Sequence, residues 1–515
     1  MEEKKWSSVE EVHSHAQDAI GKLVKSLVTE TTLQKYFDKP DNKGWIGNAI
    51  ERDWFGIPNN SRHEADIPYL GLEIKVTPIR NTRNGWSAKE RLVLNIFDFK
   101  DEYKRDFERS SFIEKANLIE LIYYEYIKGK IGPEFFITAA TLFDLKKLPK
   151  EDILIIKQDW EIIVNKIKEG KAEELSDSLT KYLGATTKGS KTEKNMTSQP
   201  FSDKKAHRRS FTLKGAYMSE VARKVMAGEH YCEEKIIEDI DELEVKLFED
   251  IVLEKFKPHI GKTKVDLAKK LGVDIPKKDD KASSAVLAKK MLNLQGDIED
   301  TEEFKKADIS VKIVTVDAAN KKTTEGFKII IPGQSVIDPA KLYNEKWEES
   351  SLREYLSSYQ FLLVIFERTT EGVYFRGAKF WHVPYDDLEG EIKQTWEEAR
   401  DKLMKGVRLE YKKLNKPTKT GKLYEVTNDL PGMSSGEILH VRPSAKVACY
   451  YDDPRYAMKL PAKSNWINRP ESTDWEEGRK PAEMVVNELS DEYMTKQAWW
   501  LNRDYMYYQV QEFFE

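Results

Sequence analysis

The chain has 515 residues, which is too long for one ordinary domain, so two large domains with separate cores are the simplest expectation. Hydrophobic residues make up 40% and charged residues 34%, a globular composition that argues against a mainly disordered chain. A net charge of −5 and an isoelectric point near pH 6.1 argue against a protein that coats nucleic acid indiscriminately, although they leave room for a local basic cleft.

The cysteines and the apolar runs restrict the class of protein further. Only Cys232 and Cys449 are present, and neither belongs to a CxxC pair, so a disulfide framework or a zinc cluster has little support. No stretch reaches the roughly 18 uninterrupted apolar residues of a membrane span. We therefore expect a soluble protein in the reducing cytoplasm.

The first hundred residues predict helices followed by strands. Residues 8–37 have the pattern of two charged helices, and a helix is expected from Trp45 to Trp54, where Gly56 and Pro58 end it. Period-two alternation predicts a strand at 71–78 and a second strand at 91–97, and we expect the two to share one sheet.

The rest of the first half is expected to be mostly helix and loop. Charged, aromatic-rich segments predict helices through much of 101–175, and the polar stretch 184–210 predicts a loop. A helix at 215–227 should close the first domain.

Three weak echoes suggest that the chain contains a duplicated domain. Residues 19–22, 41–50 and 72–79 are echoed from positions 259, 279 and 309, so the spacing is 240, 238 and 237 residues. We place a first domain at 1–228, a linker at 229–250 and a second domain at 251–515.

One constellation has the chemistry for hydrolysing a phosphodiester. In Asp66-x6-Glu73-x-Lys75 the strand period places Glu73 and Lys75 on one face, and Pro68 and Gly71 favour a turn that returns Asp66 beside them. Two carboxylates suit Mg²⁺, while the lysine can orient or deprotonate a water and stabilise negative charge. By itself the pattern also fits a solvated strand edge with a salt bridge.

Longer runs carry a family resemblance. Residues 43–51, 65–79 and 89–94 resemble MutH, the GATC-specific nickase of mismatch repair. The whole chain resembles the type II restriction endonucleases that cut at GATC and consist of two MutH-like domains. Further matches lie at 92–96, 124–129, 156–162, 466–470 and 494–497. The resemblance implies a duplicated α/β fold of the PD-(D/E)XK type, with mixed sheets flanked by helices.

The resemblance also implies the roles of particular residues. Glu51, Asp66 and Glu73 would hold Mg²⁺ beside Lys75, and Lys89 would be a further catalytic or phosphate-binding lysine. MutH has an Arg-Pro pair where this chain has Thr186 and Thr187, so individual base contacts do not transfer. The implied DNA-binding residues are Lys43, Thr187, Lys188, Lys214, Arg442 and Lys496.

The second domain is expected to have lost its catalytic site. Carrying the repeat spacing across the chain turns Glu51 into Lys289, Asp66 into Glu303, Glu73 into Ser310 and Lys75 into Lys312. We place the counterpart of Lys89 near Ser358. Losing the strand carboxylate makes divalent-cation binding electrostatically unfavourable. Because the stretch around Arg442-Pro443 retains the form of the MutH reading loop, we expect this domain to bind GATC without cutting and to regulate cleavage.

We predict a Mg²⁺-dependent type II restriction endonuclease that acts on double-stranded DNA containing GATC. One active centre per chain cuts one strand at a time, so we expect a free monomer and a transient homodimer on DNA. Two alternatives remain: a GATC-specific nickase recruited by repair proteins, and a regulatory DNA-binding protein that does not hydrolyse DNA. The intact acidic group of the first domain argues against the second alternative.

Overall fold

The computed structural model describes residues 5–38, 44–58, 65–82, 85–189, 195–227, 233–276, 281–417, 424–436, 438–469 and 490–515. The chain forms two compact units. The first comprises Met1–Pro258, Ala288–Val311 and Tyr359–Leu362, and the second comprises His259–Leu287, Lys312–Ser358 and Leu363–Glu515. The stretch expected as a linker, 229–250, lies in the first unit. No helix in the described ranges combines the length and apolar character needed to cross a membrane.

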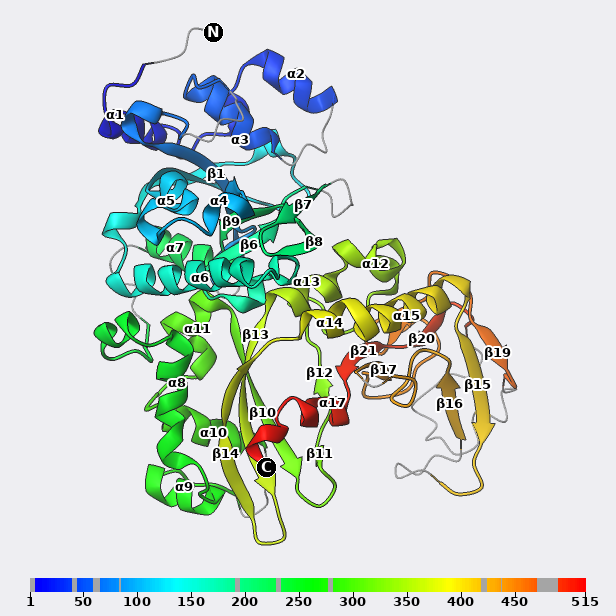
Figure 1. Cartoon of the computed structure of the whole chain (residues 1–515). Coiled ribbons are helices and arrows are strands. Elements are labelled where there is room, and N and C mark those ends of the chain that lie inside the picture. The colour runs from blue at the N-terminus through cyan, green and yellow to red at the C-terminus, as the bar shows by residue number, and fades with distance from the viewer. Residues whose placement is uncertain are drawn as a thin grey trace. The chain divides into compact units, whose positions relative to one another are not determined.

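The main sheet of the first unit has the strand order β2-β1-β4-β5, of which β1 is labelled in Figure 1. β1 (Glu73–Thr82) pairs with β2 (Gly85–Ala88) in antiparallel fashion and with β4 (Leu118–Glu125) in parallel, and β5 (Ile137–Asp144) closes the sheet. The prediction of helix through most of 101–175 is wrong at β4 and β5. β4 is a nearly continuous buried run, so it lacks the alternation that reveals a half-exposed strand.

A second sheet has the order β3-β9-β6, and a hairpin of β7 and β8 lies next to it in sequence. Two predictions are wrong here. β3 does not join the sheet of β1, because it pairs with β9, which is distant in sequence. The described parts of 184–210, residues 184–189 and 195–210, are not a loop, because their polar side chains belong mostly to strands with exposed positions. The bounds are β3 (Leu92–Phe97), β6 (Leu183–Thr187), β7 (Met196–Gln199), β8 (Ser202–His207) and β9 (Arg209–Leu213).

The helices of the first half largely follow the predictions. Apolar side chains of the first helices, such as Val12 and Ile50, share one core with Ile74 and Ile122 of the main sheet. The predicted helix at 45–54 forms as α3 followed by a π-helix, η2. The bounds are α1 (Val9–Gln17), α2 (Glu30–Asp38), α3 (Trp45–Ala49), η2 (Ile50–Trp54), α4 (Phe99–Glu102), α5 (Ser111–Ala116), α6 (Lys150–Lys168) and α7 (Gly215–Ala227).

The second half of the chain has further helices and strands, most of which are labelled in Figure 1. Its helices are α8 (Phe248–Phe256), α9 (Lys264–Leu271), α10 (Lys281–Met291), α11 (Glu302–Ala307), α12 (Pro339–Asn344), α13 (Ser351–Ser358), α14 (Tyr385–Asp387), α15 (Lys393–Lys405) and α17 (Arg503–Tyr508). Its strands are β10 (Ile309–Asp317), β11 (Lys322–Thr323), β12 (Phe327–Lys328), β13 (Gln360–Arg368), β14 (Val373–Trp381), β15 (Arg408–Lys413), β16 (Tyr424–Asn428), β17 (Leu439–Pro443), β18 (Ala457–Lys459), β19 (Asn465–Ile467), β20 (Tyr493–Thr495) and β21 (Gln497–Leu501).

The strand orders reveal the duplication. The order β11-β10-β13-β14 repeats β2-β1-β4-β5, and β12-β21-β17 repeats β3-β9-β6. Gly21 and Gly261 both have φ +79°. Their N–H groups donate over 2.8 Å to the carbonyls of Ile137 and Phe375, respectively, so the repeated Ile-Gly-Lys turn has one structural role in both halves.

Candidate active site

A tight turn places Asp66 next to the first residue of β1. The one-turn helix η3 (Pro68–Leu70) ends at Gly71, which has φ +60°, a conformation that glycine adopts at little cost. As a result, Asp66 Oδ2 accepts a hydrogen bond from the N–H of Ile74 over 2.9 Å, and the N–H of Asp66 donates to Glu73 Oε2 over 3.2 Å. The two carboxylates predicted to act together therefore lie side by side.

Two lysines bind the carboxylate of Glu73. Lys75 Nζ donates to Oε1 over 2.6 Å, and Lys115 Nζ donates to Oε2 over 2.9 Å. Lys115, from α5, was not predicted. Because β4 runs parallel to β1 and Glu73 pairs with Ile119, residues just before β4 lie at the same end of the sheet as Glu73. Only that pairing register, which the sequence does not reveal, identifies Lys115.

Glu51 of η2 belongs to the same electrostatic cluster. Burial raises its pKa to about 7, and the negative charges of Asp66 and Glu73 add to that effect. Burial and the charge of Glu73 also raise the pKa of Asp66. Burial opposes the charged form of Lys75, but Glu73 outweighs it and raises the pKa of the Lys75 ammonium. Crowded carboxylates of this kind favour a bound cation.

The donor set of this cluster fits a hard divalent cation with an incomplete protein shell. Among the described residues, no three His, Cys, Asp or Glu side chains are gathered closely enough to form a ready metal shell. Both oxygens of Glu73 are paired with ammonium groups. Mg²⁺ commonly takes one or two carboxylates and completes its octahedron with water and substrate phosphate. Asp66 and Glu73 supply such a pair, and Glu51 is a third oxygen donor nearby.

Lys89 lies apart from this cluster. Its N–H donates to the carbonyl of Pro78 over 3.0 Å, and Pro78 lies five residues beyond Glu73 along β1, which is roughly 16 Å in an extended strand. Its ammonium lies 4.4 Å from the ring centre of Tyr126 and 3.3 Å from Glu90 Oε1. The structure therefore does not bring Lys89 to Glu73.

The DNA-binding residues predicted in the first half differ in how exposed they are. Thr187 is half-buried at the end of β6, and Lys188 is exposed directly after it. Lys43 lies outside the described residues. Lys214 was predicted wrongly: it is 7% exposed, and its ammonium donates to the carbonyls of Asp177 and Thr180. Burial lowers its pKa to about 8, and its position inside the protein excludes contact with a phosphate.

A cavity of about 460 Å³ lies between α5 and the second sheet of the first unit. Lys115 lines it from α5, Asn95 from β3, and Arg208 from the turn between β8 and β9. The carbonyl of Arg208 accepts a hydrogen bond from the N–H of Lys188 over 2.9 Å. The cavity therefore extends from Lys115 to Arg208, which is hydrogen-bonded to Lys188 at the strand end where base reading is expected.

The corresponding strand of the second half presents Arg442. Its side chain is exposed, and the guanidinium lies 4.8 Å from the ring centre of Trp500. Lys496 is half-exposed, and its Nζ donates to the carbonyl of Pro454 over 2.6 Å. Thr187 pairs with Arg209, and Pro443 pairs with Gln497. These equivalent ladders place Thr186-Thr187 where the second half has Arg442-Pro443.

The pairing of β10 also locates the remains of the second catalytic site. Ile79 pairs with Ala88 and Val316 with Thr323, which keeps Ser310 in the place of Glu73 and Lys312 in that of Lys75. The prediction that Glu303 takes the place of Asp66 is wrong: its buried Oε1 accepts the N–H groups of Ile236 and Ile237. The N–H of Val311, which corresponds to Ile74, donates to Glu299 Oε1 over 2.6 Å instead.

The predicted counterpart of Lys89 near Ser358 is wrong. Thr324 takes that place, because its N–H donates to Thr315 just as Lys89 donates to Pro78. The hairpin of the second half is two residues shorter, so the 237-residue spacing leads to Gly326 rather than to Thr324, and Ser358 lies well beyond both in sequence.

Comparisons with known proteins agree with this architecture. Residues 55–159 match the family model of the DNA mismatch repair enzyme MutH. The type II restriction enzyme Sau3AI of Staphylococcus aureus is 37% identical over 97% of this chain and 98% of its own length. MutH proteins of Haemophilus influenzae (strain 86-028NP) and Shewanella oneidensis are 26% and 28% identical over 35% and 36% of this chain, and over 78% and 80% of their own lengths.

Proposed function

We propose that this chain, which belongs to the type II restriction endonucleases related to Sau3AI and contains a MutH-like nuclease domain, hydrolyses both strands of DNA at GATC with Mg²⁺. The observation that carries the proposal is the pairing of Asp66 with Glu73 beside the two ammonium groups of Lys75 and Lys115. Similarity over the full length to a restriction enzyme disfavours both the repair nickase and the regulatory protein.

The divalent metal on which this class of nuclease depends would be held by Asp66 and Glu73, with Glu51 as a further oxygen donor. Such a metal polarises the phosphate and lowers the pKa of bound water. The raised pKa of Lys75 keeps a proton on its Nζ, so this lysine orients the attacking water and stabilises negative charge rather than removing a proton. Lys115, on the other oxygen of Glu73, adds a second positive charge for the developing phosphorane.

We further propose that the second half binds another GATC site without cutting it. Ser310 replaces the metal-binding glutamate there, whereas Arg442 is exposed and able to make a bidentate contact with guanine. A palindromic site and one active centre per chain favour a free monomer that dimerises on DNA. A DNA substrate and the sparse cysteines favour action in the cytoplasm.

The test is plasmid cleavage by the full-length protein. With Mg²⁺ we expect linear fragments whose ends map to GATC, and with EDTA we expect no product. Glu73→Gln should abolish cleavage while retaining DNA binding. Nicked circles as the final product would favour the nickase, and intact plasmid with Mg²⁺ would favour the regulatory protein.

A further inference from the structure

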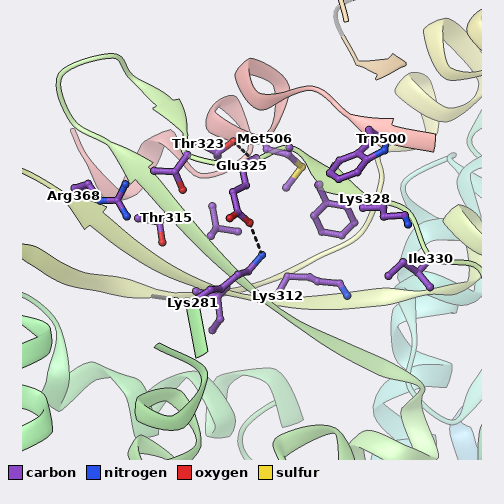
Figure 2. A pocket seen from close by; sticks show the side chains of 15 residues that line it. Lys281, Lys312, Thr315, Thr323, Glu325, Lys328, Ile330, Arg368, Trp500 and Met506 are labelled. Atoms are coloured by element: carbon purple, nitrogen blue, oxygen red, sulfur yellow. Dashed lines mark hydrogen bonds and ion pairs between the residues drawn. The ribbon is translucent and has the colours of Figure 1, made fainter. Parts of the chain in front are cut away.

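The second unit contains a pocket of about 340 Å³ between β10, the segment 323–330 and the C-terminal region (Figure 2). Four cationic side chains line it. Among the described residues that line it, Glu325 is the one carboxylate. The cations are Lys281, Lys312, Lys328 and Arg368. The lining therefore carries an excess of positive charge and suits an anion.

The pocket lies at the remains of the second catalytic site. Lys312 retains the place that Lys75 has in the first half, but Ser310 has replaced the glutamate. Loss of that carboxylate weakens the attraction for a divalent cation, whereas Lys312 keeps a positive charge in the pocket lining.

A further position retains its positive charge but changes the residue that carries it. In the first half Lys89 lies over the ring of Tyr126, which directly follows β4. In the second half Thr324 takes the place of Lys89, and Arg368 is the last residue of the equivalent strand β13. Both Thr324 and Arg368 line the pocket. The positively charged side chain is therefore Lys89, opposite Tyr126, in the first half and Arg368, opposite Thr324, in the second half. Both halves keep one positive charge at this pair of positions.

The pocket adjoins the strand that presents Arg442. Trp500 lines the pocket and stacks with the Arg442 guanidinium. Lys328 Nζ donates over 2.7 Å to the hydroxyl of Ser444, two residues after Arg442. Two residues of the pocket lining, Trp500 and Lys328, therefore contact the strand that presents Arg442.

We propose that this pocket holds a phosphodiester group of bound DNA without a metal ion, with Lys312 and Arg368 as its principal ligands. The inference rests on the proposed binding of DNA by the second half. An ammonium and a guanidinium both donate charge-assisted hydrogen bonds to phosphate oxygens. Figure 2 shows Lys281 pointing toward Glu325, whose carboxylate lies 3.3 Å from the ammonium and opposes a bound anion.

The experiment measures binding of a fluorescein-labelled duplex with one GATC site to the full-length protein in EDTA, at several salt concentrations. Without metal, the carboxylates of the first half repel phosphate, so binding reports mainly on the second half. Lys312→Ala and Arg368→Ala should each weaken binding about tenfold at low salt. Loss of one phosphate contact should also reduce the slope of log affinity against log salt by about 0.9.

Glu325→Gln removes a negative charge from the pocket lining, so it should strengthen DNA binding, opposite to the two alanine variants. The matched control is Lys405→Ala, because Lys405 is an exposed lysine paired with Asp401 over 3.2 Å on α15, away from the pocket. It should leave affinity unchanged, and Arg368→Lys should retain most of it. Equal thermal unfolding midpoints would show that the variants fold.

Arg442→Ala separates the two levels of inference. If Arg442→Ala weakens binding but Lys312→Ala and Arg368→Ala do not, the phosphate pocket is refuted and DNA binding by the second half stands. If none of the three weakens binding, the proposed DNA binding itself fails. Stabilisation by millimolar thymidine 5′-monophosphate in wild type but not in Arg368→Ala, with DNA affinity unaffected, would assign the pocket to a mononucleotide and overturn the proposal.

Discussion

Glu73 lies at the centre of the proposed catalytic cluster, where it contacts Asp66, Lys75 and Lys115. Its side chain is 3% exposed, and a buried carboxylate without partners would cost several kcal/mol. The ammonium groups of Lys75 and Lys115 offset that cost by donating to its two oxygens. In the proposed site a divalent cation would be held by Glu73 with Asp66, and Lys75 and Lys115 would supply positive charge for the phosphate from the two sides of Glu73.

This arrangement predicts different roles for two lysines. Lys115→Ala should lower the single-turnover cleavage rate about 100-fold, because it removes a positive charge beside the reacting phosphate. Lys89→Ala should lower the rate less than about tenfold, since its ammonium lies on Tyr126 rather than on Glu73. Lys115→Arg should recover part of the rate. Equal losses for the two alanine variants would contradict this assignment.

Two neighbouring glutamates should make opposite contributions to stability as pH changes. Burial raises the pKa of Glu303 from 4.5 to about 7, so the unfolded chain ionises first and stability falls as pH rises from about 4.5 to 7. Glu303→Gln should therefore stabilise the protein at pH 8, by on the order of 3 kcal/mol, and make no difference near pH 4. Thermal unfolding at both pH values measures this.

Glu302 is the matched control for that experiment. Burial opposes its ionised form, but the charge of Lys306 and bonds to Lys224 outweigh burial and lower its pKa to about 2. Its contribution is present above pH 4.5 and is lost as pH falls toward 2. Glu302→Gln should thus lower the unfolding midpoint at pH 8, opposite in sign to Glu303→Gln.

At the scale of elements, the turn before β1 decides whether Asp66 reaches Glu73. The predicted turn is confirmed, and the helices at 215–227 and 45–54 form as expected. Strand partners were not predictable, because β3 pairs with β9, which lies more than a hundred residues away in sequence. Pairing of distant strands depends on the packing of the whole unit rather than on local pattern.

Substitutions at Gly71 test whether this turn positions Asp66 beside Glu73. A Cβ at Gly71 would meet no atom within 4 Å, so substitution is opposed only by φ +60°. Gly71→Ala should lose about 1 kcal/mol of local stability and, by displacing Asp66, about tenfold in cleavage rate. Gly71→Asn should be milder, because asparagine tolerates this conformation. Asp308, with φ +57°, shows that a related side chain is accommodated before β10. Equal rates for the alanine variant and wild type would refute this role.

At the scale of the whole molecule, the duplicated halves do not coincide with the compact units. The segment Ala288–Val311 belongs to the first unit. There Lys306 forms a buried ion pair with Asp152 over 2.5 Å. Removing residues 240–515 would therefore delete part of the first unit, which contains the proposed catalytic residues. Substitutions in the full-length chain are the better test of regulation.

Arg442→Ala supplies such a substitution. We expect it to weaken discrimination for GATC in the second half by about 1–3 kcal/mol. Cleavage of a plasmid with one GATC site should change little, whereas any difference between one-site and two-site plasmids should diminish. Comparison of the two cleavage rates measures the effect. A difference between plasmids that persists unchanged would argue against a regulatory second half.

The sequence alone determined the family and the grouping of Asp66, Glu73 and Lys75. It also determined that Ser310 replaces the Glu73 carboxylate in the second half, because all of these are properties of residue type and short spacing. Tertiary structure decided that Lys115 joins Glu73, that Lys214 is buried, and that Thr324 replaces Lys89. Those outcomes follow from strand register and from which groups share a low-dielectric interior, which distant parts of the chain establish only when they pack together.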